Sequence, residues 1–171
     1  MILQSATENC VHGKSPSDEK ITLTVSGSSG VERVLSAVSN ENGEYEIIIP
    51  PYPPSFESYT LTFSCGGEKI VFSDVLFGEL YHISGQSNME LELQNAKGGK
   101  EVLENLTPDC NVRFYYTQKR GTLDEMFYED ENNTAWSQAS KDNSRAWSAV
   151  GFFFGRKLAK DLGVTVGLIG C

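Results

Sequence analysis

The segment from His82 to Leu93 reads HISGQSNMELEL and contains the residues best suited to chemistry. Ser87 lies in a Gly-Gln-Ser-Asn turn that directly follows a strand-like apolar run. A serine hydroxyl at the end of a strand can attack an acyl group if a neighbouring base removes its proton. If a helical turn begins at Asn88, its free N–H groups would stabilise an oxyanion at the same place. The alternative is that Ser87 only caps a helix or closes a turn.

A base for Ser87 is hard to find, because the chain has only two histidines, His12 and His82, and both precede the serine. His82 lies inside the strand-like run. A strand rises about 3.3 Å per residue and alternates faces, so we expect His82 to lie below the turn as a packed or satisfied strand residue and not as the base. No Asp-x-x-His follows Ser87. The sequence therefore predicts a nucleophile whose histidine and aspartate partners are absent from this chain.

Other polar groups give weaker signals. Glu90 and Glu92 share one face if the segment is extended, but a carboxylate-pair glycosidase needs a partner that the sequence does not identify. The acidic stretch 124–132 lacks the glycine and the spacing of a calcium loop, so a solvated surface is expected. The cysteines are widely spaced and predict neither a zinc site nor a disulfide scaffold: Cys10, Cys65, Cys110 and Cys171. We therefore expect no metal and no cofactor.

The aromatic residues fall into two groups. One group has helical spacing and is expected to be core rather than a platform for sugars: Trp147, Phe152, Phe153 and Phe154. The other lies in or near a long polar excursion and could line a carbohydrate site: Tyr115, Tyr116, Phe127, Tyr128 and Trp136.

The elements that must position these residues change character near residue 76. Before that point, alternating runs predict strands over Lys20–Gly27, Val31–Val38 and Asn40–Pro51. The stretch Ser58–Val75 predicts two more strands, joined by a hairpin at Gly66-Gly67. Five strands at hairpin spacing, with no helical period, indicate an antiparallel β-sandwich domain over residues 1–75.

After residue 76 the pattern becomes α/β. Leu76–Ser84 predicts a strand buried on both faces, and Asn111–Tyr116 and Val164–Gly170 predict two more. Ser148–Gly163 predicts a helix that ends at a Gly163 cap and leads directly into the third strand, which favours a parallel sheet. The expected apolar stripe of this helix is Val150, Phe153, Phe154, Leu158 and Leu162, with Lys157 at its margin. Three strands are fewer than such a sheet usually has, so residues 76–171 predict an incomplete domain.

These motifs resemble a known family. FGELYHISGQSNMELEL is similar to the nucleophile block of the sialate O-acetylesterase family within the SGNH hydrolases, with Tyr81 where that family has tryptophan. WSAVGFFFGRKLAKDLGVTVGLIG resembles the later helix–strand block of the family. MILQ and VHGKSPSDEKITLTVSG resemble its N-terminal β-domain, where His12 stands at a usual tryptophan. The resemblance covers essentially the whole chain and corresponds to the N-terminal portion of the family.

The resemblance implies an activity and a set of roles. Ser87 would be the nucleophile and its backbone N–H an oxyanion donor, while Gln86 and Asn88 shape the turn. The implied reaction is metal-free hydrolysis of an O-acetyl ester on a sialic acid or related sugar, through an acetyl-serine, in a flavodoxin-like SGNH domain. The family's base and further oxyanion donors lie downstream of the Gly-Leu-Ile strand. This chain would then hold the nucleophile half of the enzyme, be inactive alone, and have the missing C-terminal half as its partner.

Composition limits the partners. The 171 residues carry 23 acids against 14 bases, a net charge of −9, which argues against nucleic acid or anionic membrane as a partner and leaves acetylated sugars open. No apolar run reaches the roughly 20 residues that a membrane-spanning helix needs. The first ten residues do not resemble a signal peptide, which favours the cytoplasm without fixing the compartment. Two alternatives remain open: a non-catalytic carbohydrate-binding module, and an acetyl esterase that acts on plant polysaccharide.

Overall fold

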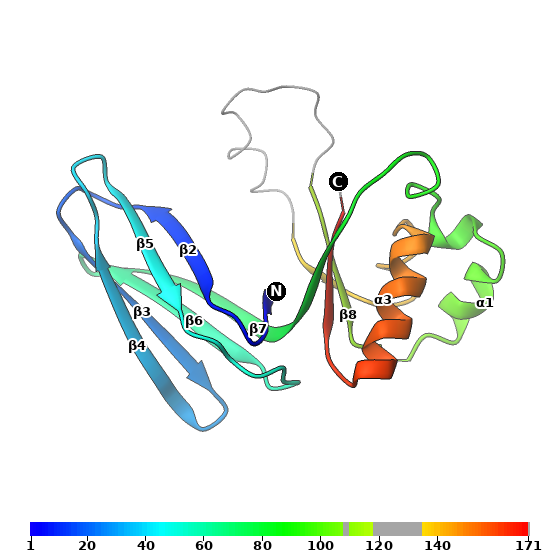
Figure 1. Cartoon of the computed structure of the whole chain (residues 1–171), viewed down its shortest axis with the longest axis horizontal. Coiled ribbons are helices and arrows are strands. Elements are labelled where there is room, and N and C mark those ends of the chain that lie inside the picture. Colours follow the sequence, from blue (N-terminus) through cyan, green and yellow to red (C-terminus); the bar gives the residue numbers. More distant parts are fainter. Residues whose placement is uncertain (108–109, 118–134, 171) are drawn as a thin grey trace. The chain divides into compact units, whose positions relative to one another are not determined.

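The chain, described by a computed structural model over residues 1–107, 110–117 and 135–170, is mostly β-structure and divides into two compact units. Unit 1 comprises Met1–Ile2 and Gly78–Cys171, and unit 2 comprises Leu3–Phe77. Within the described residues, a mixed eight-stranded sheet has the strand order β4-β3-β6-β7-β10-β8-β9, with β1 (Ile2–Gln4) paired to β7 (Figure 1).

Unit 2 is built from antiparallel strands. Their bounds are β2 (Asn9–Lys14), β3 (Lys20–Gly27), β4 (Gly30–Val38), β5 (Glu44–Ile49), β6 (Tyr59–Cys65) and β7 (Glu68–Ile83). β3 pairs with β4 and β6, and β6 pairs with β7, while β2 and β5 form a separate two-stranded sheet. Alternate residues of β3 are buried, namely Ile21, Leu23 and Val25, as the period of two requires for a sheet with one face in the core.

The aromatic residues Tyr52, Tyr59 and Phe77 pack together in this unit. The rings of Tyr52 and Phe77 stack with centroids 4.2 Å apart, and the Tyr59 ring meets Phe77 edge-on at 5.2 Å. All three side chains are buried, so this cluster joins the segment after β5 to β6 and β7.

β7 is one continuous strand of 16 residues, which corrects the prediction of a separate strand over 76–84. It pairs antiparallel with β6 near its start and parallel with β10 near its end, so a single strand begins in unit 2 and ends in unit 1. The expectation that its second half is buried on both faces is also wrong. Val75–Gly78 are buried, but Glu79, Leu80, Tyr81 and Ile83 are only half-buried and His82 is exposed.

Unit 1 has a short parallel sheet. Its elements are the 3₁₀ turn η1 (Leu93–Asn95), α1 (Gly99–Glu104), β8 (Val112–Tyr116), β9 (Ser137–Gln138), α3 (Ala149–Leu162) and β10 (Val166–Gly170). β10 lies between β7 and β8 and is parallel to both, so the predicted parallel arrangement is confirmed. In the paired register Gly170 stands beside Ile83 on one side and Tyr116 on the other. All three strands therefore end at the same edge.

Helix α3 has the predicted position and the predicted C-terminal cap, and the structure adds an N-terminal cap that was not predicted. The Ser148 side chain accepts a hydrogen bond from the Gly151 N–H at its start, and Gly163 ends it in the left-handed conformation. The predicted buried stripe is wrong, because Val150, Phe153, Phe154, Lys157 and Leu162 are exposed and Leu158 is half-buried. The buried residues are instead Ala149, Gly151, Phe152, Gly155 and Ala159.

Small residues explain this change of face. A Cβ added at Gly155 would lie 2.9 Å from Leu168 Cδ1 of β10, so the helix backbone approaches the sheet too closely for a larger side chain. Phe152 supplies the bulk on this face and is fully buried in a core with Phe114, Trp147 and Leu168. The stripe predicted from the large apolar residues therefore lies on a different face of α3 from the one that packs on the sheet.

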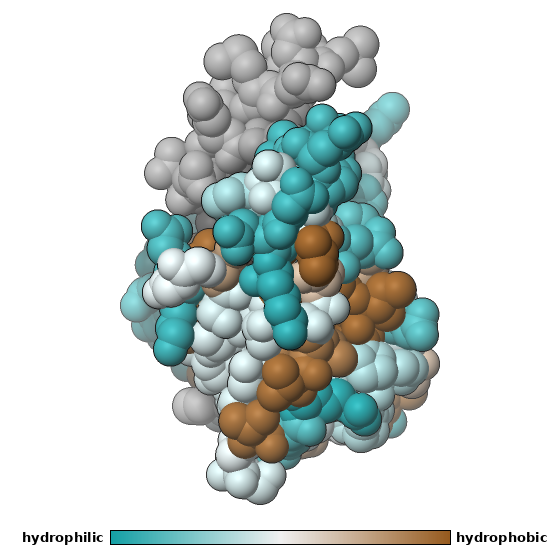
Figure 2. Space-filling view, turned by 90° about the vertical axis from the view of Figure 1, so that its left-hand side faces the viewer, coloured by the Kyte–Doolittle hydropathy of each residue, from teal (hydrophilic) through white to brown (hydrophobic). Residues whose placement is uncertain are grey.

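The surface carries separate apolar areas. In Figure 2 the brown apolar groups lie between hydrophilic side chains rather than forming a single continuous patch. Exposed apolar residues of unit 2 include Val31, Val34, Val38, Ile70 and Phe72. Among the described residues, none of the helices combines the length and the apolar character that crossing a bilayer would require.

Candidate functional site at the carboxyl edge of the parallel strands

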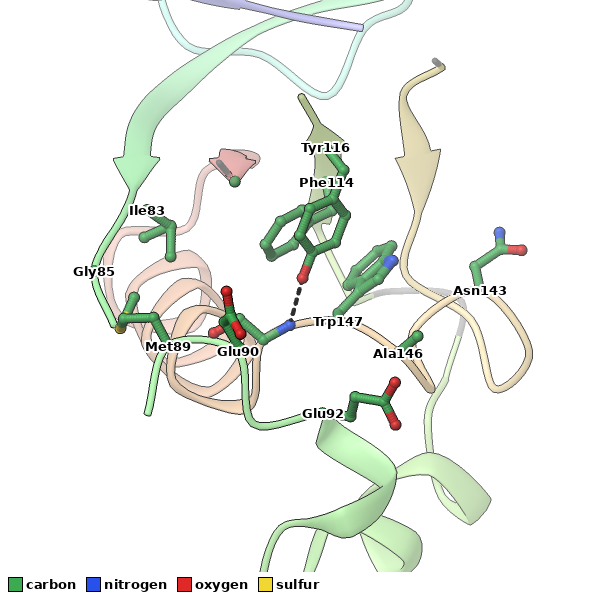
Figure 3. Close-up of a pocket in the computed structure, with 12 residues that line it drawn as sticks. Ile83, Gly85, Met89, Glu90, Glu92, Phe114, Tyr116, Asn143, Ala146 and Trp147 are labelled. Carbon is green, nitrogen blue, oxygen red and sulfur yellow. Dashed lines mark hydrogen bonds between the residues drawn. The ribbon is translucent and has the colours of Figure 1, made fainter. Parts of the chain in front are cut away.

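A cavity of about 520 Å³ lies at the edge where β7, β10 and β8 end. The last residue of each strand lines it: Ile83, Gly170 and Tyr116. The carboxyl edge of parallel strands is where open α/β sheets bind ligands. Phe114 of β8 also lines it, and the remaining lining residues come from the segments after β7 and before α3: Gly85, Met89, Glu90, Glu92, Asn143, Ala146, Trp147 and Ser148 (Figure 3).

Two overlapping turns fold the segment after β7 back on itself. The Met89 N–H donates to the Gln86 carbonyl at 2.8 Å, and the Glu90 N–H donates to the Ser87 carbonyl at 3.2 Å. Gly85 is needed at the start of these turns, because a Cβ there would lie 2.6 Å from Met89 Cγ. Gly85 and Met89 line the cavity on either side of Ser87, which is itself exposed. The predicted nucleophile therefore lies in the turn between two cavity-lining residues, although Ser87 itself is not among the residues that line the cavity.

Ser87 is free to react with a ligand. Within the described part of the chain, neither its hydroxyl nor its backbone N–H takes part in a hydrogen bond, and the Asn88 N–H makes none either. An unpaired N–H beside a serine hydroxyl is what an oxyanion donor requires. A hydroxyl without a base is a weak nucleophile, so the turn by itself is an incomplete catalytic site.

The two histidines do not complete it. His82 lies on β7, one residue before the strand ends, and is exposed, so a packed side chain is wrong there, but it does interact with a neighbouring group, as the alternative of a satisfied strand residue expects. The half-buried lower part of the strand explains the error, since only Val75–Gly78 are enclosed. His12 lies on β2 in unit 2 and contacts Cys10 and Glu46.

The start of α3 forms the opposite wall. The Ser148 N–H donates to the Tyr116 hydroxyl at 2.8 Å, and the Tyr116 ring stacks on Phe114 with centroids 4.6 Å apart (Figure 3). Trp147 is buried and lies 5.1 Å from Phe114, centroid to centroid. Aromatic side chains with polar tips are common in carbohydrate sites. Tyr116 was among the aromatics expected near such a site, whereas Trp147 was expected only in the core and is both core and cavity wall.

Two carboxylates line the same cavity. Glu92 accepts hydrogen bonds from the Gln94 amide at 2.7 Å and the Asn95 amide at 2.9 Å, and these neutral donors fix its position without cancelling its charge. Glu90 lies one turn from Ser87 and also faces the cavity. Their spacing of two in the sequence was the only signal for this pair, and a carboxylate partner on a second strand remains unidentified.

Several other predicted residues lie elsewhere. The Trp136 ring packs beside Tyr115 at 5.6 Å, centroid to centroid, and is not among the cavity residues. Phe153 and Phe154 are exposed on α3, so their assignment to the core is wrong. Phe127, Tyr128, the acidic stretch 124–132 and Cys171 lie outside the described residues. Asn143 and Ser148 were not predicted as site residues, and only their positions before and at the start of the predicted helix could have suggested them.

The chain is similar in sequence to known esterases. It is 26% identical over 159 residues to the sialate O-acetylesterase of Rattus norvegicus and 28% identical over 163 residues to that of Pongo abelii. The chain therefore resembles the sialate O-acetylesterases in sequence over most of its length. The family resemblance predicted from the motifs is thereby confirmed. Each alignment covers 86% of this chain but only 29% and 30% of the two relatives, so the chain spans less than a third of their length. No family model matches it.

A solved structure shares the fold. The crystal structure of a carbohydrate acetylesterase from Xanthomonas citri matches 99% of this chain with a TM-score of 0.83, at 23% sequence identity. The match covers 37% of that protein. The arrangement of strands and helices described above is therefore also present in that carbohydrate acetylesterase.

Proposed function

We propose that this chain is the nucleophile-bearing part of a carbohydrate O-acetylesterase, in which Ser87 attacks the acetyl carbonyl of an O-acetylated sugar. The observation that carries the proposal is that Ser87 is exposed, makes no hydrogen bond through its hydroxyl among the described residues, and stands between Gly85 and Met89, which line the cavity at the strand ends. The named esterase relatives support the reaction class.

The chemistry follows from a serine nucleophile. A base takes the hydroxyl proton while Oγ of Ser87 bonds to the acetyl carbon, and the backbone N–H of Ser87 stabilises the resulting oxyanion. The C–O bond to the sugar then breaks, and the leaving sugar oxygen receives the proton from the base and becomes a hydroxyl. Water attacks the acetyl-serine in a second step and releases acetate. Gln86 and Asn88 hold the turn that presents the hydroxyl.

The base must come from outside this chain. Its only histidines are His12 and His82, and the Ser87 hydroxyl makes no hydrogen bond with either. Losing the base of a serine hydrolase removes most of the acceleration, by several orders of magnitude in well-studied cases. We infer that the 171 residues alone have little activity and that a further segment supplies histidine and aspartate.

The same proposal includes a finer description of the fold. Unit 2 corresponds to an antiparallel β-sandwich, and the sheet of unit 1 corresponds to the first part of an SGNH-type α/β domain. Two antiparallel sheets in unit 2 and the parallel order β7-β10-β8 in unit 1 support it.

The charge of the cavity bears on the substrate. Glu90 and Glu92 both line it, and like charges within a cavity disfavour an anionic ligand. An acetylated neutral polysaccharide such as acetylated xylan is therefore a second candidate beside an acetylated sialic acid, which carries a carboxylate. Release of acetate from the two substrates at equal ester concentration separates them.

A covalent serine probe tests the proposal. A fluorophosphonate applied to the longer protein that includes this chain should label it, and Ser87→Ala should abolish labelling. Ser84→Ala is the matched control, because Ser84 is exposed in the same segment and has no assigned role. Equal labelling of the parent and Ser87→Ala would reject the assignment.

A further inference from the structure

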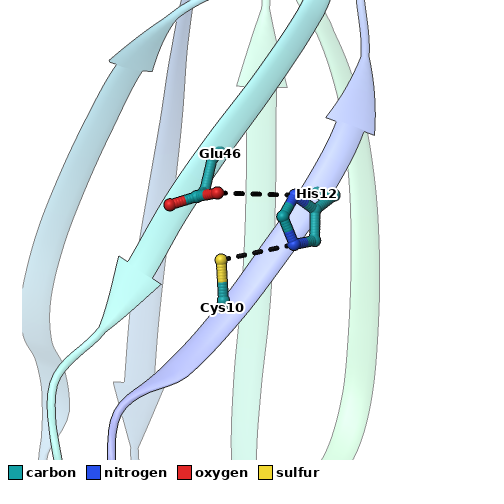
Figure 4. Close-up of side chains that lie close together, drawn as sticks. All are labelled: Cys10, His12 and Glu46. Carbon is teal, nitrogen blue, oxygen red and sulfur yellow. Dashed lines mark hydrogen bonds and ion pairs between the residues drawn. The ribbon is translucent and has the colours of Figure 1, made fainter.

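Three side chains with metal-binding atoms meet on the outer face of the two-stranded sheet. Cys10 and His12 are two residues apart on β2, so their side chains point to the same face, and His12 is paired directly with Glu46 of β5. Cys10 Sγ lies 3.4 Å from His12 Nε2, and His12 Nδ1 lies 3.6 Å from a Glu46 carboxylate oxygen (Figure 4).

The donor set suits one kind of ion. A thiolate, an imidazole and a carboxylate are the ligands that Zn²⁺ takes in proteins, and zinc sites with three protein ligands keep a fourth position for water. One thiolate and one carboxylate would balance the two charges of the ion. Ca²⁺ and Mg²⁺ prefer oxygen ligands and would leave the sulfur unused.

The distances fit with a small adjustment. Zinc bonds of about 2.0–2.3 Å in a tetrahedral site place the donor atoms roughly 3.3–3.8 Å apart. The Cys10–His12 pair already has this separation, and the donor atoms of all three residues lie within 4.8 Å of one another. The side chains of His12 and Glu46 are 70% and 53% exposed, so both can turn and an ion can enter from solvent.

We propose that Cys10, His12 and Glu46 form a surface zinc site in which Sγ, Nε2 and one carboxylate oxygen bind the ion and water takes the fourth position. Zn²⁺ displaces the proton of the Cys10 thiol on binding. The expectation from the cysteine spacing of no zinc site is revised at this position.

Titration of the reduced chain with Zn²⁺, followed by calorimetry, tests the proposal. One ion should bind per chain, and Cys10→Ser, His12→Ala and Glu46→Gln should each weaken binding at least about 10-fold, since even loss of an outer partner of a ligand typically costs 10- to 100-fold. Co²⁺ as a substitute ion should give the ultraviolet charge-transfer absorption of a cobalt–thiolate bond in the parent and lose it in Cys10→Ser.

Cys65→Ser is the matched control, because Cys65 is a half-buried free thiol on β6 outside this cluster. It should bind Zn²⁺ like the parent. Failure of the parent to bind Zn²⁺, or equal affinity in the parent and Cys10→Ser, would overturn the proposal and leave the three residues as a polar cross-strand contact. The affected side chains are exposed, and far-UV circular dichroism checks that each variant is folded.

Discussion

The carboxyl edge of the parallel strands and the outer face of the β2–β5 sheet hold complementary features of a site. At the first, Ser87 lies between Gly85 and Met89, which line a cavity of about 520 Å³, and its hydroxyl makes no hydrogen bond among the described residues. At the second, Cys10, His12 and Glu46 already contact one another but lie on an exposed strand pair.

A functional site needs both a cavity and a set of chemical groups held together, and each of the two regions shows one of these requirements. A cavity follows from topology, because three parallel strands that end in register leave a hollow between the loops that follow them. An assembled donor set follows from local pairing, because alternate residues of a strand and their cross-strand neighbour share a face. Unit 1 meets the first requirement and unit 2 meets the second, so the account predicts that the two regions respond to different changes.

The largest effect is expected at Ser87. In the longer protein that includes this chain, Ser87→Ala should lower the rate of acetate release by about 10³-fold or more, since it removes the atom that bonds to the acetyl carbon. Zn²⁺ affinity should stay unchanged, because Cys10, His12 and Glu46 are untouched. A variant that keeps more than a tenth of the parent rate would contradict the role given to Ser87.

The next effect concerns the core behind the cavity. Phe152→Ala should lower the free energy of unfolding by about 3–5 kcal/mol, because the side chain is fully buried against Trp147. Phe153→Ala is the matched control and should cost no more than about 1.5 kcal/mol, since Phe153 is 38% exposed. Both tryptophans lie in unit 1, so urea denaturation followed by tryptophan fluorescence reports on this unit. Equal losses of the free energy of unfolding in the two variants would instead support the apolar stripe predicted from the sequence.

The smallest effect is a pH dependence in unit 2. Burial, and then the carboxylates of Glu32 and Glu57, raise the pKa of Tyr59 from its ordinary value to about 12. Between about pH 10 and pH 12 the unfolded chain loses a proton that the folded chain keeps, so the free energy of unfolding falls as the pH rises. Tyr59→Phe removes this contribution, and its stability should fall less steeply in urea titrations followed by far-UV circular dichroism. If the free energy of unfolding of Tyr59→Phe fell with rising pH as steeply as that of the parent, the raised pKa of Tyr59 would be contradicted.

The sequence predicted elements whose signals are local. The strand Lys20–Gly27 was predicted with the bounds that β3 has, and the Gly66-Gly67 hairpin joins β6 to β7 as expected. The C-terminal cap of α3 at Gly163 was predicted because it depends on one residue type at one position. The turn at Ser87 was likewise found from its place after a strand.

Features set by packing between elements were not predicted. Glycines and alanines make up most of the buried face of α3, because their small side chains let the helix backbone approach the sheet closely. The search for large apolar residues therefore selected the wrong side of the helix. The strand β2 was missed, and with it the contact between Cys10, His12 and Glu46. The alternation Cys-x-His was visible, but Glu46 joins the pair only through the register of β2 with β5.

Mapping the covalent adduct of a fluorophosphonate tests the central claim most directly. After labelling of the longer protein, digestion and mass spectrometry should place the phosphonate on Ser87, within the peptide that contains Gly-Gln-Ser-Asn-Met. An adduct on any other serine, with Ser87 unmodified, would contradict the account.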